Sequence, residues 1–137
     1  MTIRAGRLDE VEAVLTFWRK AAEGTDRHDT AAAVLQLIER DPAALLIAEL
    51  DDEIVGTLIA GWDGWRAHLY RLAVHPDHRR KGVATALLNA AEERFAGFDA
   101  FRADAMVLDD NVLAHRAWLA AGYARQPQWG RWVKPLR

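Results

Sequence analysis

The fold is decided by the stretch LAVHPDHRRKGVATALL, which occupies residues 72–88. An apolar segment stops at His-Pro, a basic turn follows, and Gly82 opens an alanine- and leucine-rich segment typical of a helix. The first N–H groups of a helix are unpaired and its dipole favours negative charge there, while a glycine lets a ligand approach the backbone. Arg79, Arg80 and Lys81 add positive charge at the same place. The stretch therefore predicts a phosphate-binding turn between a strand and a helix.

Two common nucleotide-binding motifs do not occur in this sequence. Gly82 is followed by Val83 and Ala84, so the lysine and the hydroxyl of a Walker loop are missing, and there is no G-x-G-x-x-G. The alternative interpretation of the stretch is a solvated basic turn ahead of a surface helix. The net charge of −2 argues against general nucleic-acid binding, so we expect no nucleic-acid partner.

Length and composition predict one domain over residues 1–137. Apolar residues make up 51% of the chain and charged residues 28%, which is usual for a soluble protein. No apolar run is long enough to cross a membrane, and the N-terminus lacks the apolar core of a signal peptide. We therefore expect a cytoplasmic protein with no membrane partner. Because there is no cysteine, thiolate metal sites and cysteine catalysis are excluded, and we expect no metal.

Apolar periodicity and turn signals predict a chain of alternating helices and strands. Strands are expected at residues 2–5, 45–50, 54–62, 65–74 and 101–108, followed by a closing hairpin of 123–125 with 129–133. Helices are expected from a cap at Asp9 to residue 22, from a cap at Asp29 or Thr30 to before Pro42, over 82–95, and from Asp110 or Asn111 to Gly122. A strand–helix–strand unit that follows antiparallel hairpins makes a mixed α/β sheet with a parallel pair.

Two motifs resemble those of the GCN5-related N-acetyltransferase (GNAT) family. The first is Arg79-x-x-Gly82-x-Ala84, which follows an apolar strand as in the family's motif A. The second is NVLAHRAWLAAGY at residues 111–123, which resembles N-x-x-A-x-x-[aliphatic]-Y-x-x-x-G-[FY]. The expected order of elements also matches the family along the chain. The resemblance implies the GNAT fold: an α/β, mostly antiparallel central sheet with helices on both faces and a splayed parallel strand pair.

The resemblance also implies acetyl-coenzyme A (acetyl-CoA) as co-substrate. In the family the turn binds the pyrophosphate, the preceding strand holds the pantetheine, and the N–H at the Val74 position binds the thioester oxygen. The expected binding residues are Leu72, Ala73, Val74, Arg79, Arg80, Lys81, Gly82, Val83, Ala84, Thr85, Asn111 and Ala114. Asn111 and its helix would line the pantetheine arm. The simpler interpretation is that Asn111 is a helix cap and Ala114 part of an apolar stripe.

Catalytic candidates follow from the same resemblance. His68 lies at the strand position where the histone-acetyltransferase branch carries its base glutamate, and its ordinary pKa suits a general base. The alternative is a histidine that pairs with a neighbouring strand. Tyr70, two residues on, could orient a water, and Glu49 is a further candidate base. Trp118 replaces the usual tyrosine acid, so it would donate a hydrogen bond to the sulfur or pack against the acetyl end. The thiolate would then leave without a dedicated acid, or Tyr123 or a water would act as the acid.

The acceptor amine is expected opposite the cofactor, against the first helices and the closing hairpin. Trp18, Asp26, Asp29 and Trp129 are the candidate substrate-binding residues, because carboxylates and indole faces suit a cationic amine. The alternative is that Trp18 belongs to the core and the carboxylates to a solvated loop.

The function implied is an N-acetyltransferase that moves the acetyl group of acetyl-CoA to a primary amine of a small molecule or peptide by direct transfer. We expect a monomer or homodimer. One alternative is a non-catalytic acyl-CoA sensor with the same fold, which the Trp118 departure keeps open. Another is a nucleic-acid- or protein-binding module that uses the basic turn, which predicts steep salt dependence.

Overall fold

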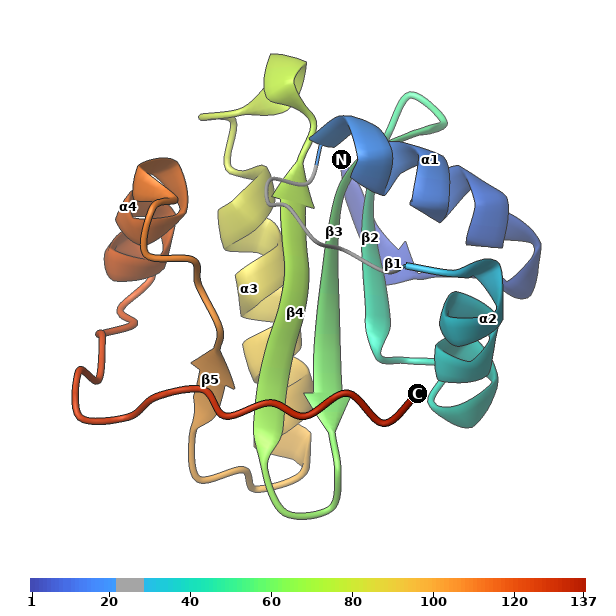
Figure 1. Ribbon diagram of the computed structural model, residues 1–137. Helices are drawn as coiled ribbons and strands as arrows, with labels where there is room; N and C mark the ends of the chain where they lie inside the picture. The colour runs from blue at the N-terminus through green and yellow to red at the C-terminus, as the bar shows by residue number, and fades with distance from the viewer. Residues whose placement is uncertain (22–28) are drawn as a thin grey trace.

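The computed structural model describes residues 1–21 and 29–137, which form a five-stranded sheet with helices on both faces (Figure 1). The strands are β1 (Thr2–Ala5), β2 (Leu45–Leu50), β3 (Glu53–Trp62), β4 (Ala67–Val74) and β5 (Ala103–Ala105). The helices are α1 (Val11–Ala21), α2 (Ala31–Arg40), α3 (Val83–Gly97) and α4 (Val112–Ala120), with short 3-10 turns η1 (Leu8–Glu10) and η2 (Pro76–His78). None of the described helices combines the length and apolarity needed to span a membrane.

The strands follow one another across the sheet in the order β1-β2-β3-β4-β5. The first three pairs are antiparallel, and β4 and β5 are parallel with α3 as their crossover. The predicted mixed, mostly antiparallel sheet is therefore confirmed, and so is the parallel pair that follows the basic turn.

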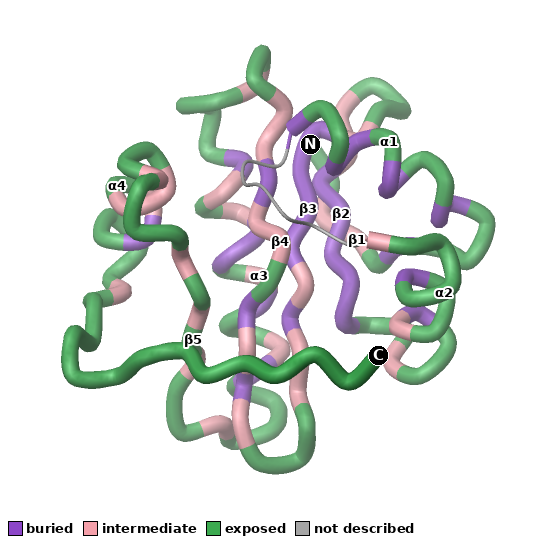
Figure 2. Tube along the Cα trace, in the orientation of Figure 1, coloured by how far each residue is buried: buried purple, intermediate pink, exposed green. Residues whose placement is uncertain are grey.

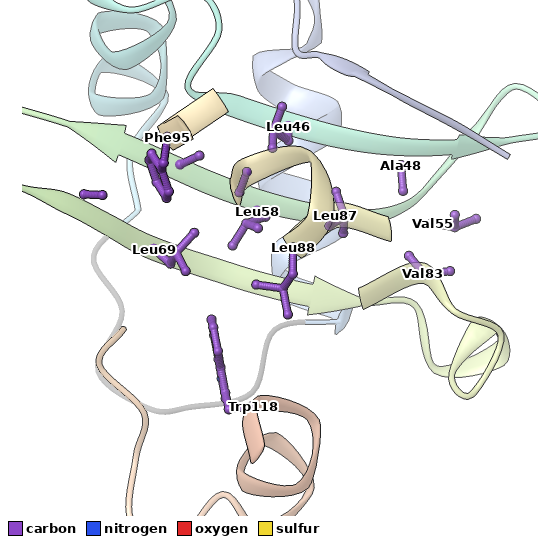
Figure 3. Close-up of a cluster of buried hydrophobic side chains, with 13 residues drawn as sticks. Leu46, Ala48, Val55, Leu58, Leu69, Val83, Leu87, Leu88, Phe95 and Trp118 are labelled. Carbon is purple, nitrogen blue, oxygen red and sulfur yellow. The ribbon is translucent and has the colours of Figure 1, made fainter. Parts of the chain in front are cut away.

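Two apolar clusters hold the helices to opposite faces of the sheet. Along β2, Leu45 and Ile47 pack with α1 and α2, whereas Leu46 and Ala48 pack with α3, as strand alternation requires. Figure 2 shows the buried residues concentrated in the strands and on the inner sides of the helices. Figure 3 shows the α3-side cluster, to which α4 contributes Trp118.

A glycine in β3 sets the height of α3 above the sheet. A Cβ at Gly56 would lie 2.6 Å from Val83 Cγ1 and 3.0 Å from Leu87 Cδ1, so a larger residue would push the helix away. Val83 is the first residue of α3, and the close packing fixes the place where that helix begins. The start of α3 therefore lies near the end of β4, whose C-terminal residue leads through η2 into the helix.

The parallel pair separates after a short stretch of pairing. Its matched residues run from Ala67 opposite Ala103 to Leu69 opposite Ala105, and β4 then continues alone to Val74. Figure 1 shows β4 extending beyond the short β5, while the chain after β5 turns away toward α4. Within the described residues, positions 70–74 of β4 thus face an open edge of the sheet.

Several local expectations were wrong. The strand expected at 101–108 is limited to three residues, and the described residues 123–137 contain no strand, so the closing hairpin is not formed. Asp9 does not cap the first helical segment; the Glu10 carboxylate accepts the Arg7 N–H at 2.9 Å instead. The caps of α2 and α4 are Thr30 and Asn111, each accepting an N–H at 3.1 Å.

Candidate functional site

The basic turn has the geometry of an anion site at a helix N-terminus. Gly82 caps α3 with φ +80°, a conformation that L residues rarely adopt, and a Cβ there would meet nothing within 4 Å. The Ala86 N–H donates to Gly82 O at 3.0 Å and is the first hydrogen bond of the helix. The N–H groups of Val83, Ala84 and Thr85 therefore have no acceptor within the helix. The first turn of α3 and the glycine therefore present backbone donors to open space.

Three cations lie on the same turn. Arg79, Arg80 and Lys81 are all exposed and directly precede Gly82, and Arg80 has φ +63°. The positive charge, the helix dipole and the accessible N–H groups act on the same volume. The structure thus brings together the turn residues that the sequence singled out.

Two backbone N–H groups of β4 point to its open edge. The His75 N–H donates to Val55 O at 2.8 Å, so it faces β3. Because successive N–H groups of a strand point to opposite sides, those of Val74 and Leu72 face away from β3, toward the open edge. Ala73 is buried and its N–H faces β3. Of the three predicted strand donors, Leu72 and Val74 are therefore placed to bind a ligand, and Ala73 is not.

Helix α4 places its predicted residues in structural roles. Asn111 Oδ1 accepts the Ala114 N–H, so the amide caps the helix as the simpler interpretation held. Trp118 is buried in the α3-side cluster and packs edge-on to Tyr123 at 5.0 Å between ring centroids. Tyr123 donates to Glu92 Oε2 at 3.1 Å, and burial raises the pKa of this phenol well above its ordinary value. That pKa makes Tyr123 a poor proton donor.

His68 lies between two carboxylates where β4 and β5 are still paired. Its Nδ1 is 2.8 Å from Asp104 Oδ1 on β5, and its Nε2 is 3.3 Å from Asp63 Oδ2 in the β3–β4 turn. The Asp104 hydrogen bond is the main cause that raises the pKa of His68 above 6.5. A histidine that pairs with a neighbouring strand was the alternative to a base, and the structure shows that pairing.

A pocket of about 400 Å³ opens beside His68 on the face that α2 covers in part. Tyr70, Trp62 and Asp63 line it together with Leu37 and Arg40 from α2. Trp62 stacks flat on Phe98, with 5.1 Å between the ring centroids. The pocket combines the Asp63 carboxylate, the His68 imidazole and aromatic edges with the Arg40 guanidinium, so groups of both charges line it.

The predicted acceptor residues do not converge. Trp18 is 5% exposed and donates to Thr57 Oγ1 at 2.8 Å, which is a core position. Asp29 is ion-paired with Arg71, Trp129 is 70% exposed on the C-terminal segment, and Asp26 lies outside the described residues. Glu49, the further candidate base, is ion-paired with Arg4 at 2.9 Å.

Sequence reasoning missed the two carboxylates that bind His68. Asp63 lies in the turn between the strands expected at 54–62 and 65–74, and its Oδ1 accepts the N–H groups of Trp65 and Arg66 there. Asp104 faces His68 only through the β4–β5 register, which no local pattern encodes. Among residues 1–21 and 29–137, no group of three metal-ligating side chains is arranged to hold a metal.

Comparisons with known proteins agree with this fold. An acetyltransferase of Pectobacterium atrosepticum is 36% identical over 111 residues, which cover 81% of this chain and 79% of the relative. Ard1 of Thermoplasma volcanium superimposes with a TM-score of 0.78 at 22% identity, over 90% of this chain and 82% of that one. A diaminobutyrate acetyltransferase of Paenibacillus lautus, solved with its substrate and coenzyme A, gives 0.75 at 21% identity, over 87% and 72%. The profile of the acetyltransferase (GNAT) family matches residues 11–123, and the chain belongs to that family.

Proposed function

We propose that this protein transfers the acetyl group of acetyl-CoA to the primary amine of a small molecule or peptide. The observation that carries the proposal is the juxtaposition of an exposed, basic helix N-terminus at Gly82 with the open edge of β4 directly before it. A phosphate-bearing ligand held at the first feature can lay its remaining length along the second.

The turn and the strand edge would bind different parts of acetyl-CoA. Backbone N–H groups at the start of α3, with Arg79, Arg80 and Lys81, would hold the pyrophosphate. The N–H groups of Leu72 and Val74 would bind the pantetheine amide and the thioester oxygen. An N–H fixed at that oxygen stabilises the negative charge that develops as the amine attacks. The β4 edge therefore serves both binding and catalysis.

The acceptor amine would enter from the pocket beside His68. The amine nitrogen attacks the thioester carbon, a C–N bond forms, the C–S bond breaks and the sulfur leaves as coenzyme A thiolate. Because His68 lies six residues before Val74 on β4, the amine proton would reach it only through ordered water, which Tyr70 would help to orient. Asp104 holds the imidazole in place, and Asp63 adds negative charge that favours a cationic acceptor. Trp118 lies in the core between α3 and α4 and would take no part in proton transfer, and a thiolate leaving group needs no protein acid.

An amine panel with a thiol-reactive dye, which reports released coenzyme A, tests the proposal. We expect turnover with at least one primary amine, and a loss of at least tenfold in kcat for His68→Asn. Arg66→Gln, in the same turn region but outside the pocket lining, is the control and should retain activity. Binding of acetyl-CoA without turnover on any amine would favour the sensor instead, a function that the replacement of the usual tyrosine by Trp118 also fits.

A further inference from the structure

A strained residue interrupts β4 immediately before the proposed thioester-binding edge. Arg71 has φ +56°, in the left-handed region, and it is neither a glycine nor in a turn. At this point Thr57 pairs with Ala73 and Ile59 pairs with Tyr70, so two residues of β4 oppose one of β3. This is a β-bulge, and a strained backbone of this kind persists only where its surroundings hold it.

The bulge decides which N–H groups face the open edge. The Ala60 N–H donates to Ala44 O, toward β2, so Ala60 and its β4 partner Leu69 form a pair without mutual hydrogen bonds. The Leu69 N–H therefore faces β5. In an uninterrupted strand the N–H of Ala73 would face the same way. Because of the bulge, the N–H groups of Leu72 and Val74 do so instead.

Thr57 holds the bulge through its hydroxyl. It is completely buried in β3, donates to Arg71 O at 3.0 Å and accepts the Trp18 indole N–H at 2.8 Å. The Arg71 side chain is held separately by an ion pair with Asp29, and its guanidinium lies 5.6 Å from the Trp18 ring centroid. The hydroxyl thus connects Trp18 of α1 directly to the backbone carbonyl of the strained residue in β4.

We infer that Thr57 is a positioning residue for acetyl transfer, because its hydroxyl fixes the β4 bulge that aims the Leu72 and Val74 N–H groups at the pantetheine arm and the thioester. The effect on acetyl transfer rests on the proposed function, whereas the role of the hydroxyl in holding the bulge does not. The hydroxyl uses one donor and one acceptor, both inside the protein, and a methyl group in its place would fill the same volume without holding the carbonyl. The bulge would then be free to shift.

Thr57→Val tests the inference, with Thr57→Ser as the conservative variant. We expect kcat to fall at least tenfold in Thr57→Val and to stay within threefold of the parent in Thr57→Ser. The Kd of coenzyme A, which has no acetyl group, should rise by a smaller factor than kcat falls, because the phosphate-binding turn of α3 is untouched and only the pantetheine contact at the β4 edge is disturbed. Ile47→Val is the control, since Ile47 pairs with Thr57 across β2 and β3 and lies in the same apolar cluster as Trp18, and it should keep kcat. A kcat loss in Ile47→Val equal to that in Thr57→Val would overturn the inference.

A second measurement separates this inference from the proposed function. In the free protein, the amide NMR signals of Leu72 and Val74 should move further in Thr57→Val than in Ile47→Val. Equal movement would overturn the inference whether or not the parent transfers acetyl groups. A parent that neither binds acetyl-CoA nor turns over would refute the function, while the amide signals would still decide the role of Thr57. If Thr57→Val does not fold, Trp18→Phe/Thr57→Val, which leaves no indole N–H unpaired, replaces it in both measurements.

Discussion

Protonation of Glu10 should remove much of the stability of the β1–α1 corner. The Glu10 carboxylate accepts both Arg4 Nη1 at 2.8 Å and Arg4 Nη2 at 2.7 Å, and its side chain is 11% exposed. These hydrogen bonds are the main cause that lowers the pKa of Glu10 from 4.5 to about 2. At 1.36 kcal/mol per pKa unit the shift corresponds to about 3 kcal/mol, and solvent screening reduces our expectation to about 2 kcal/mol.

The sign follows from linkage. Because the folded-state pKa of Glu10 is lowered, its contribution is complete above 4.5 and is lost as the pH falls toward 2. Glu10→Gln mimics the protonated acid, so urea unfolding should show a deficit of about 2 kcal/mol near pH 7 that shrinks to less than half near pH 3. Asp9→Asn is the control, because Asp9 is exposed and forms only a surface pair with Arg7, worth less than about 0.5 kcal/mol. A deficit for Glu10→Gln that does not change with pH would refute the reasoning.

Gly82→Ala and Gly64→Ala should each lower the free energy of unfolding by about 1 kcal/mol in denaturant titration, since both glycines have positive φ and open space around a Cβ. Only Gly82→Ala should also weaken coenzyme A binding in calorimetry. Equal affinities for the two variants would contradict the assignment of the turn. The midpoint of the acidic limb of the kcat–pH profile should lie above pH 6.5, because His68 must lose its proton to act as base and its pKa is raised. Asp104→Asn should move that midpoint to lower pH, because it removes the main cause of the raised pKa. A limb that stays in place in this variant would exclude His68 as the base. Tyr123→Phe should keep kcat within twofold, because this phenol is bound to Glu92 and its pKa is raised, and a tenfold loss would make Tyr123 the acid.

The parts of the fold that sequence predicts well are those with local causes. The turn before Gly82, the left-handed Gly122 after α4 and the Thr30 cap each depend on a few neighbouring residues, and each is present. The order of strands and helices followed from apolar periodicity, because β2 buries its residues at the two-residue period of a strand and α3 buries its residues at helical spacing.

The parts that failed depend on contacts between distant segments. The apolar residues at 129–133 predict a strand, but a strand forms only where it can pair with the edge of another strand. Within the described chain this segment pairs with none. The indole of Trp18 is a side chain of the kind that binds cationic ligands, but its hydrogen-bond partner is Thr57, 39 residues away in the sequence. Likewise, the carboxylate of Asp104 reaches His68 only because β5 returns parallel to β4.

The most direct test of the account is calorimetric titration of acetyl-CoA into the parent, Gly82→Asp and Gly64→Asp. Both variants place one negative charge at a glycine with positive φ, but only Gly82 lies at the N-terminus of α3. We expect micromolar binding by the parent and by Gly64→Asp, and a loss of at least tenfold in Gly82→Asp. Absence of binding by the parent, or equal binding by all three proteins, would contradict the central claim that the β4–α3 turn holds the phosphates of acetyl-CoA.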